Sequence, residues 1–234
     1  APAVIIRNIF ENPSWYTSYT PFQAEISQGR LEALIVFQTM ISSLTGFPLS
    51  NCSMLDDATA AAEAMRMMYN LRSRDAVKAG KNVLLVEKNI FPQVLSVIET
   101  RSATLGIKLK LTECTADAYT DDCFGAIVQY PAADGKVNDY SAFCQSVHEK
   151  GGLVSAYCDL LALAILKEPA AWGADIAVGT AQRFGLPMGF GGPTAGFMAC
   201  REEYKRSIPG RIIGLSQDRL GNPALRLALQ TREQ

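Results

Sequence analysis

The sequence lacks several features that mark common functional classes. It holds a single histidine, His148, and this scarcity argues against histidine-based hydrolase triads and most zinc enzymes. Neither the phosphate-loop pattern GxxxxGK[ST] nor the dinucleotide pattern GxGxxG occurs, so nicotinamide chemistry has little support. The 22 basic and 23 acidic residues are balanced, which argues against nucleic acid and anionic membranes as partners.

Long apolar runs and a secretion signal are also missing. No uninterrupted apolar stretch reaches the length of a membrane span, and no signal peptide is visible. We therefore expect a soluble chain in the bacterial cytoplasm or an organelle matrix. The six cysteines form no CxxC pair and several lie within apolar runs, so we interpret them as reduced core residues without a metal. His148 lies in FCQSVHEKGG, where a surface position at the end of a helix is expected.

Helical and strand-like segments alternate along the chain. Helical spacing of apolar residues predicts helices over 30–45, 55–73, 92–106 and 140–152. Short apolar or alternating runs predict strands over 82–87, 108–113, 123–131 and 153–159. This alternation predicts an α/β fold, with right-handed crossovers and a mainly parallel sheet covered on both faces.

Residues 173–200 are the stretch around which the rest is organised. They read as a buried strand, a glycine-rich turn with Gly189, Gly191 and Gly192, and a second apolar strand. A glycine-rich backbone of this kind can approach a ligand closely. The alternative is that the turn is only a tight connection between two core strands. Gln182 and Arg183 precede the turn, where a strand has ended. Because carboxyl ends of parallel strands meet at one edge, we expect Arg183 and the strand-end Asp159 to be neighbours.

Two acidic positions have alternative interpretations. Asp159 has the chemistry to pair with a pyridinium nitrogen, a metal or an arginine, or to cap the following helix. The helix that begins near Asp57 offers backbone N–H groups and the Thr59 hydroxyl to a phosphate. However, Asp56 and Asp57 would repel an anion, which favours a well-capped structural helix.

The two ends of the chain differ in character. Residues 7–29 mix aromatic and polar side chains without a clear period, which indicates an ordered functional loop that Pro13 and Pro21 keep extended. The chain begins Ala1-Pro2-Ala3 without methionine, and LALQTREQ at the other end shows a helical pattern with no capping glycine. These ends predict a piece of a longer protein.

Four stretches resemble the P-protein family of the glycine cleavage system, glycine dehydrogenase (decarboxylating). They are ENPSWYTSYTPFQAEISQGRLEAL, LDDATAAAEAM, VGTAQRFGLPMGFGGPTAGF and GNPALRLALQTREQ. The resemblance implies the aspartate-aminotransferase (type I) fold of pyridoxal phosphate enzymes, a three-layer α/β/α sandwich around a mixed seven-stranded sheet. It also implies glycine as substrate, pyridoxal 5'-phosphate as cofactor, and the lipoyl group of H-protein as acceptor of the aminomethyl group.

The resemblance further implies which part of that family this chain represents. The family has two homologous halves, fused or as separate subunits, and the Schiff-base lysine lies in the C-terminal half. Here Gln182 stands where that lysine would stand, and a glutamine amide cannot form an imine. Asp159 resembles the acid that pairs with the pyridinium nitrogen, retained in a half that has lost the lysine. We therefore expect residues 30–234 to be the large domain of the N-terminal half without its small domain, preceded by an active-site segment over 1–29.

In this family the N-terminal half contributes wall residues to a cleft shared with the C-terminal half. The resemblance assigns that role to Thr17, Tyr19, Thr20, Glu25, Gln28 and Arg183. Thr194 stands where the family commonly has histidine, so the role of that histidine is not carried over. One alternative is a non-catalytic module that assembles with the catalytic half or H-protein. Another is an independent enzyme that uses Lys167 or Lys205, although neither lies at a strand end beside Asp159. By itself the chain is expected to bind no cofactor and to be inactive.

Overall fold

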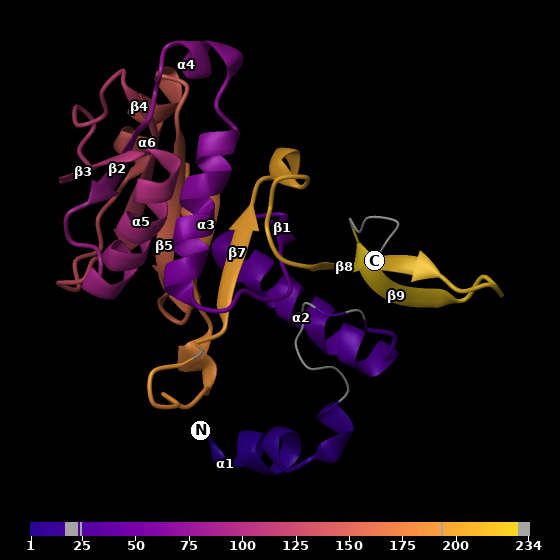
Figure 1. Ribbon diagram of the computed structural model, residues 1–234. Helices are drawn as coiled ribbons and strands as arrows, with labels where there is room; N and C mark the ends of the chain where they lie inside the picture. The colour runs from indigo at the N-terminus through magenta and orange to yellow at the C-terminus, as the bar shows by residue number, and fades with distance from the viewer. Residues whose placement is uncertain (17–22, 24, 193, 229–234) are drawn as a thin grey trace.

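The structure is a computed structural model that describes residues 1–16, 23, 25–192 and 194–228. Its centre is a seven-stranded sheet in the order β1-β7-β6-β5-β4-β2-β3 (Figure 1). The strands are β1 (Leu49–Ser50), β2 (Val83–Glu87), β3 (Lys108–Thr112), β4 (Cys123–Tyr130), β5 (Leu153–Asp159), β6 (Ile176–Thr180) and β7 (Gly196–Cys200). Strands β3, β2, β4, β5 and β6 are parallel, whereas β7 is antiparallel to β6 and β1. The prediction of a mixed, mainly parallel seven-stranded sheet is confirmed.

Helices cover both faces of the sheet (Figure 1). One apolar cluster contains residues of α3 (Asp57–Asn70) and α5 (Pro92–Leu105), and the other contains residues of α2 (Gln28–Thr45) and α6 (Ser141–Glu149). Along β2, Leu84 belongs to the first cluster and Leu85 to the second. Since successive side chains of a strand point to opposite faces, both faces are buried, and the three-layer arrangement is confirmed.

Local signals in the sequence set the ends of these helices. The Asp56 carboxylate accepts a hydrogen bond from the Thr59 backbone N–H at 2.7 Å, which caps α3. Gly46 ends α2 with φ of 76°, a left-handed conformation that glycine adopts without a steric penalty. The helix predicted over 55–73 is observed as α3, which ends at Asn70, and a separate helix, α4 (Arg74–Lys78), follows with Ser73 as its cap. The remaining single turns are η3 (Ala162–Ala164), η4 (Pro169–Trp172), η5 (Gln182–Phe184) and η6 (Glu202–Tyr204).

The N-terminal segment is helical and lies outside the sandwich (Figure 1). It comprises α1 (Ala3–Ile5), the π-helical η1 (Ile6–Phe10) and the 3₁₀ turn η2 (Pro13–Trp15). The expectation that Pro13 keeps the segment extended is wrong, because Pro13 opens η2 directly after the cap residue Asn12. The segment contacts the loop after β6, where a Cβ on Gly185 would lie 2.5 Å from the Ile5 side chain.

A β-hairpin projects sideways from the sandwich, on the side of β1 and β7 (Figure 1). It consists of β8 (Ile212–Gln217) and β9 (Pro223–Ala228), which pair antiparallel. Leu227 and Ala228 belong to β9, so the helical pattern read at the C-terminus is wrong for these two residues; residues 229–234 lie outside the described residues. In the described part of the chain, no helix has the length and apolar character that a membrane crossing needs.

Candidate functional site

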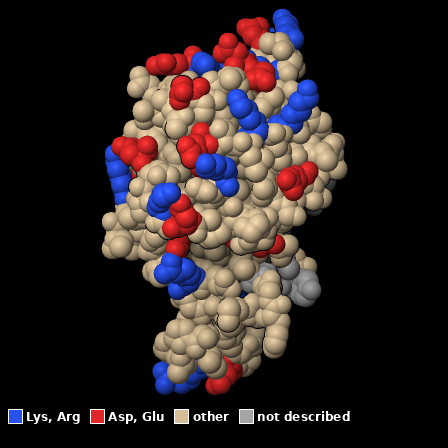
Figure 2. All heavy atoms as spheres, turned by 90° about the vertical axis from the view of Figure 1, so that its left-hand side faces the viewer, with Lys and Arg blue, Asp and Glu red and all other residues tan. Residues whose placement is uncertain are grey.

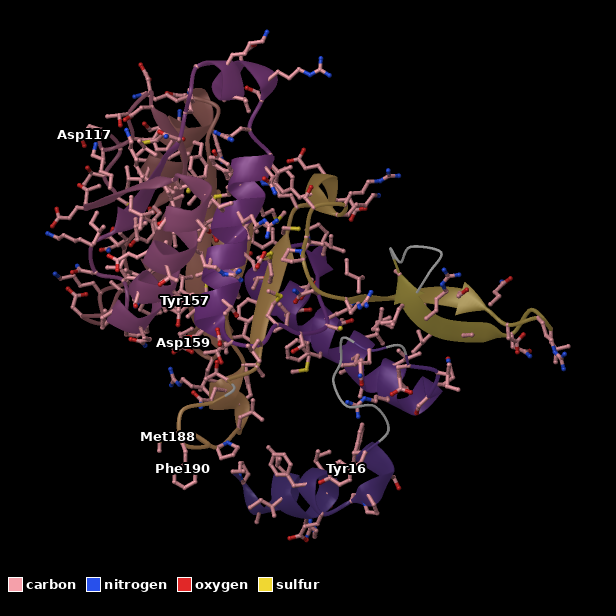
Figure 3. All side chains as sticks on the ribbon, viewed as in Figure 1. Tyr16, Asp117, Tyr157, Asp159, Met188 and Phe190 are labelled. Carbon is pink, nitrogen blue, oxygen red and sulfur yellow. The ribbon has the colours of Figure 1, made fainter. Side chains whose placement is uncertain are left out.

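Asp159 and Arg183 form an ion pair at the carboxyl edge of the sheet. Asp159 is the last residue of β5 and pairs in register with Thr180, the last residue of β6, and Arg183 follows in η5. Figure 3 shows Asp159 at the base of the loop that follows β6. The prediction that these two residues are neighbours is confirmed. The second oxygen of Asp159 accepts the Leu161 backbone N–H at 3.1 Å, so the carboxylate also caps the following turn.

Gln182 and Arg183 line a pocket of about 320 Å³. Its other walls are Ala1 and Pro2 from the N-terminal segment, and Gly185, Leu186 and Met188 from the loop after β6. The Gln182 amide donates a hydrogen bond to the Pro187 carbonyl at 3.4 Å, and the Gln182 backbone N–H donates to the Thr180 hydroxyl at 3.0 Å. The pocket therefore presents an amide and a guanidinium, and neither group forms an imine with an aldehyde.

A second carboxylate, Asp57, fixes the other side of the same loop. In the first turn of α3, it accepts hydrogen bonds from the buried Tyr157 hydroxyl of β5 and from the Thr194 hydroxyl, the latter at 3.2 Å. Burial raises the pKa of Tyr157, and the neighbouring Asp57 carboxylate raises it further. Two carboxylates at the start of α3 are thus occupied by groups of this chain, which confirms the prediction of a capped structural helix.

The loop between β6 and β7 has a fixed base and an exposed tip. At its base, the Thr180 hydroxyl donates to the Thr194 carbonyl, and the Ala181 N–H donates to Ala195 at 3.0 Å. Gly189, Gly191 and Gly192 have positive φ, as expected for a backbone that cannot be helical. Met188 and Phe190 point away from the sandwich (Figure 3). The loop spans residues 181–195 and is longer than a tight connection between core strands.

The other predicted wall residues lie elsewhere. Thr17, Tyr19 and Thr20 lie outside the described residues. Glu25 accepts the backbone N–H groups of Ile26 and Ser27 at 3.0 and 2.9 Å and pairs with Arg30 at 3.6 Å. The Gln28 amide bonds both backbone polar groups of Leu225 in β9. Among the described residues, the contacts of Glu25 and Gln28 lie at the start of α2 and at the hairpin, with none to the Asp159–Arg183 pair.

A buried charge cluster at the amino ends of β5 and β6 was not predicted. The buried Asp175 carboxylate accepts hydrogen bonds from His148 Nε2 and the Val154 N–H, both at 2.8 Å, and pairs with Arg201 Nε at 3.0 Å. His148 lies at the end of α6, as predicted, but it contacts a buried acid. The feature of the sequence that could have indicated this cluster is an aspartate, Asp175, directly before the buried strand β6. Three donors therefore satisfy this buried carboxylate, as is usual for a buried polar group.

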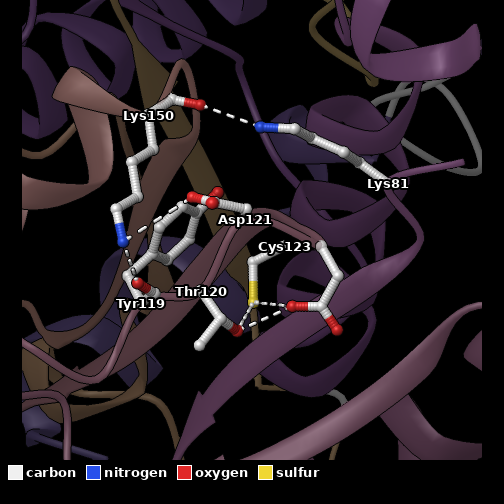
Figure 4. Close-up of polar contacts among 7 residues, drawn as sticks. Lys81, Tyr119, Thr120, Asp121, Cys123 and Lys150 are labelled. Atoms are coloured by element: carbon white, nitrogen blue, oxygen red, sulfur yellow. Dashed lines mark hydrogen bonds and ion pairs between the residues drawn. The ribbon is translucent and has the colours of Figure 1, made fainter. Parts of the chain in front are cut away.

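The amino ends of β4 and β5 carry a second polar network (Figure 4). Lys150 Nζ donates to the Tyr119 carbonyl at 2.7 Å, and Lys81 Nζ donates to the Lys150 carbonyl at 3.1 Å. Cys123 lies 3.3 Å from the Thr120 hydroxyl. All six cysteines are free and buried, which confirms their interpretation as core residues. The described residues include no group of three or more histidine, cysteine or acidic side chains arranged to hold a metal ion.

Comparison with known proteins gives a consistent result. The family described as "Glycine cleavage system P-protein" matches residues 1–234. Glycine dehydrogenase (decarboxylating) of Bacteroides fragilis is 56% identical over 233 residues, which are 100% of this chain and 25% of the relative. Putative mitochondrial glycine dehydrogenase (decarboxylating) of Schizosaccharomyces pombe is 58% identical over 236 residues, 100% of this chain and 22% of the relative. The chain thus spans about a quarter of the length of these curated relatives.

Solved structures agree with this result. The inhibitor-bound crystal structure of glycine decarboxylase (P-protein) superposes with a TM-score of 0.87 at 34% identity, covering 99% of this chain and 52% of that chain. Cystathionine gamma-lyase from Lactobacillus plantarum, complexed with L-serine, has a TM-score of 0.57 at 14% identity, covering 80% of this chain and 49% of that one. At that identity the second likeness concerns the fold alone. The shared fold is the α/β arrangement described above, with helices on both faces of a mixed seven-stranded sheet.

Proposed function

Because the chain belongs to the glycine cleavage system P-protein family, we propose that it is the large domain of the N-terminal half of a glycine decarboxylase. The complete protein would decarboxylate glycine with pyridoxal 5'-phosphate and transfer the aminomethyl group to the lipoyl group of H-protein. Residues 30–234 would form the domain, preceded by an active-site segment over 1–29. Since the chain spans about a quarter of its curated relatives, the activity belongs to the assembled protein in a cytoplasm or organelle matrix.

The glutamine at position 182 is the main support for the proposal that this half does not anchor the cofactor. It follows β6 at the position expected for the Schiff-base lysine, and its amide bonds to Pro187. The groups around it do not fit an anchored pyridoxal phosphate either: Asp159 is paired with Arg183, and Asp56 and Asp57 occupy the start of α3. We therefore propose that the cofactor is anchored in the other half and not by residues of this chain.

The contribution of this chain would be a wall of the shared cleft. Arg183 is 59% exposed and faces the pocket beside Gln182. Asp159 orients the guanidinium through Nη1, which leaves Nη2 and Nε without hydrogen bonds to described residues. An oriented guanidinium binds a carboxylate through two parallel N–H donors. Glu25 and Gln28 fix the start of α2, so we propose that they position the segment containing Thr17, Tyr19 and Thr20.

Borohydride trapping on the full-length parent protein tests this proposal. The protein is loaded with pyridoxal 5'-phosphate, reduced and digested, and glycine–CO₂ exchange is measured with lipoylated H-protein. We expect exchange activity and a single reduced lysine outside residues 1–234. A reduced lysine within this range would overturn the proposal, and Lys167→Arg and Lys205→Arg would identify it. The 234-residue chain alone should give no aldimine absorbance with added cofactor.

The exposed loop tip favours a second candidate, an assembly module that touches no reacting group. Met188 and Phe190 are among the most exposed apolar side chains, and such side chains mark interaction surfaces. Arg183→Gln in the complete protein separates the two functions. A cleft-wall role predicts a loss of glycine exchange by about tenfold or more with assembly unchanged, because a charged hydrogen bond to substrate is lost. An assembly role predicts weaker assembly instead. Tyr19→Phe and Glu25→Gln extend the same test to the N-terminal segment.

A further inference from the structure

Phe190 combines an exposed side chain with an unfavourable backbone conformation. It is fully exposed and has φ of 57°, a left-handed conformation that a bulky non-glycine residue adopts rarely. Its neighbours Gly189, Gly191 and Gly192 also have positive φ. A strained residue persists when an interaction compensates for the strain. Because the side chain is fully exposed, its packing against the described residues supplies none of that compensation.

Hydrogen bonds hold the loop in the shape that presents this side chain. The backbone N–H groups of Gly191 and Gly192 both donate to the Met188 carbonyl at 3.1 Å, which closes the tip. The Gln182 amide holds Pro187 at 3.4 Å, and Asp57 holds Thr194 at the far end of the loop. The exposure of Met188 and Phe190 is therefore a feature of an ordered turn.

The N-terminal segment extends the same apolar surface. Ile5 and Pro2 contact the loop at Gly185, and Val4 and Phe10 on the same segment are exposed. Figure 2 shows this lower lobe with wide uncharged surface and charged groups mainly at its lower end, whereas acidic and basic side chains alternate over the sandwich above. The surface suits an apolar partner better than a charged one.

We propose that Met188 and Phe190 insert into an apolar pocket on the part of the parent protein outside this chain. The curated relatives are about four times as long as the chain, so a large partner is available within the same protein. Met188 also lines the pocket of Gln182 and Arg183. A partner seated on the loop tip would therefore lie at the mouth of that pocket. The identity of the partner rests on the function proposed above; the docking role of the loop rests on its own geometry.

Photo-crosslinking in the full-length parent protein tests the docking. Phe190 is replaced by p-benzoylphenylalanine, and the crosslinked peptides are mapped by mass spectrometry. We expect a crosslink to a peptide of the same protein outside residues 1–234. A crosslink to residues 1–234 of a second copy, a crosslink to H-protein alone, or no crosslink would overturn the proposal. Val77 is the matched control, because it is an exposed apolar residue on α4, at the opposite end of the sandwich (Figure 1).

Hydrogen exchange on Phe190→Gly gives an independent measurement. Glycine removes the side chain and relieves the backbone at φ of 57°. If only hydrogen bonds within the loop hold it in shape, the backbone amides of this variant should exchange as slowly as before or more slowly. Docking predicts that amides of residues 182–196 exchange about tenfold faster or more, as for loss of an interface anchor, and that Phe190→Leu keeps most of the protection. Unchanged exchange in Phe190→Gly would contradict the docking.

The two proposals fail separately. Glycine–CO₂ exchange by the parent protein without the Phe190 crosslink would leave the proposed function standing and remove the docking role. The crosslink without glycine exchange would leave the docking role standing and remove the proposed function.

Discussion

Gln38, a buried side chain of α2, bonds both backbone polar groups of Ile213 in β8. The Ile213 N–H donates to Gln38 Oε1 at 2.7 Å, and Gln38 Nε2 donates to the Ile213 carbonyl at 3.2 Å. Gln28 repeats this arrangement with Leu225 in β9, at 2.7 and 3.1 Å. Two glutamines of one helix therefore attach one strand each of a hairpin that lies outside the main sheet.

Gln38→Ala should destabilise the chain more than Gln28→Ala. The first substitution leaves the buried backbone groups of Ile213 without partners, which costs about 1–3 kcal/mol. The second acts at an exposed bond that water replaces, with an expected cost below about 1 kcal/mol. Urea unfolding of the two variants measures the difference. Equal losses would show that burial does not distinguish the two attachments.

Asp175→Ala should be among the most destabilising single substitutions of a charged residue. It removes a buried acceptor of three donors and leaves the Val154 N–H unpaired beside His148 and the Arg201 guanidinium. Breaking such a buried group costs about 3 kcal/mol. Lys205→Ala is the control, since its pair with Glu202 is exposed and should contribute less than about 1 kcal/mol. Thermal and urea unfolding of both variants provide the comparison.

Alanine substitutions at two glycines should change the free energy of unfolding in opposite directions, because one glycine is closely packed and the other lies on an open helix surface. A Cβ at Gly179 in β6 would lie 2.1 Å from the Cys158 carbonyl oxygen, so Gly179→Ala should destabilise by about 3 kcal/mol. A Cβ at Gly29 in α2 meets no atom within 4 Å, so Gly29→Ala should stabilise by up to about 1 kcal/mol. If both substitutions change the free energy of unfolding in the same direction, the packing assigned to one of them is wrong.

Most of the sandwich was predictable because its signals are local. The run LVSAYCD predicted the strand observed as β5, and Pro92 and Gly106 marked the two ends of α5. The neighbourhood of Asp159 and Arg183 followed from one rule, that parallel strands place their carboxyl ends at the same edge. These inferences needed only periodicity, caps and topology.

The rest depends on contacts between distant residues, which periodicity does not encode. Ile212–Gln217 forms a strand because it pairs with β9 and with Gln38 from another part of the chain. Asp175 showed no sign of its contact with His148, because α6 and β6 meet only in the folded sheet. Likewise, Asp57 reaches Tyr157 and Thr194 across three elements. We expected Gln28 at the wall of a cleft, and periodicity gave no sign of its hydrogen bonds to Leu225 in β9.

Alkaline pH should unfold this protein through its buried thiols. Burial raises the pKa of Cys52 to about 11, and that of Cys144 and Cys200 to about 12, from an ordinary value of 9.0. Between the unfolded and folded pKa values, the unfolded chain has released these protons and the folded chain retains them. The free energy of unfolding therefore falls as pH rises through this window, and the thiol contribution is fully present below it.

Urea unfolding at intervals between about pH 8 and 11 measures this slope, since the thiols of the unfolded chain ionise near pH 8.5–9. Cys144→Ala should make the slope shallower, because one proton fewer is released on unfolding, although the cavity lowers stability at every pH. A matched Ser207→Ala variant, at an exposed position without a thiol, should leave the slope unchanged. A free energy of unfolding that stays constant over this range would mean that the thiols are not buried in solution.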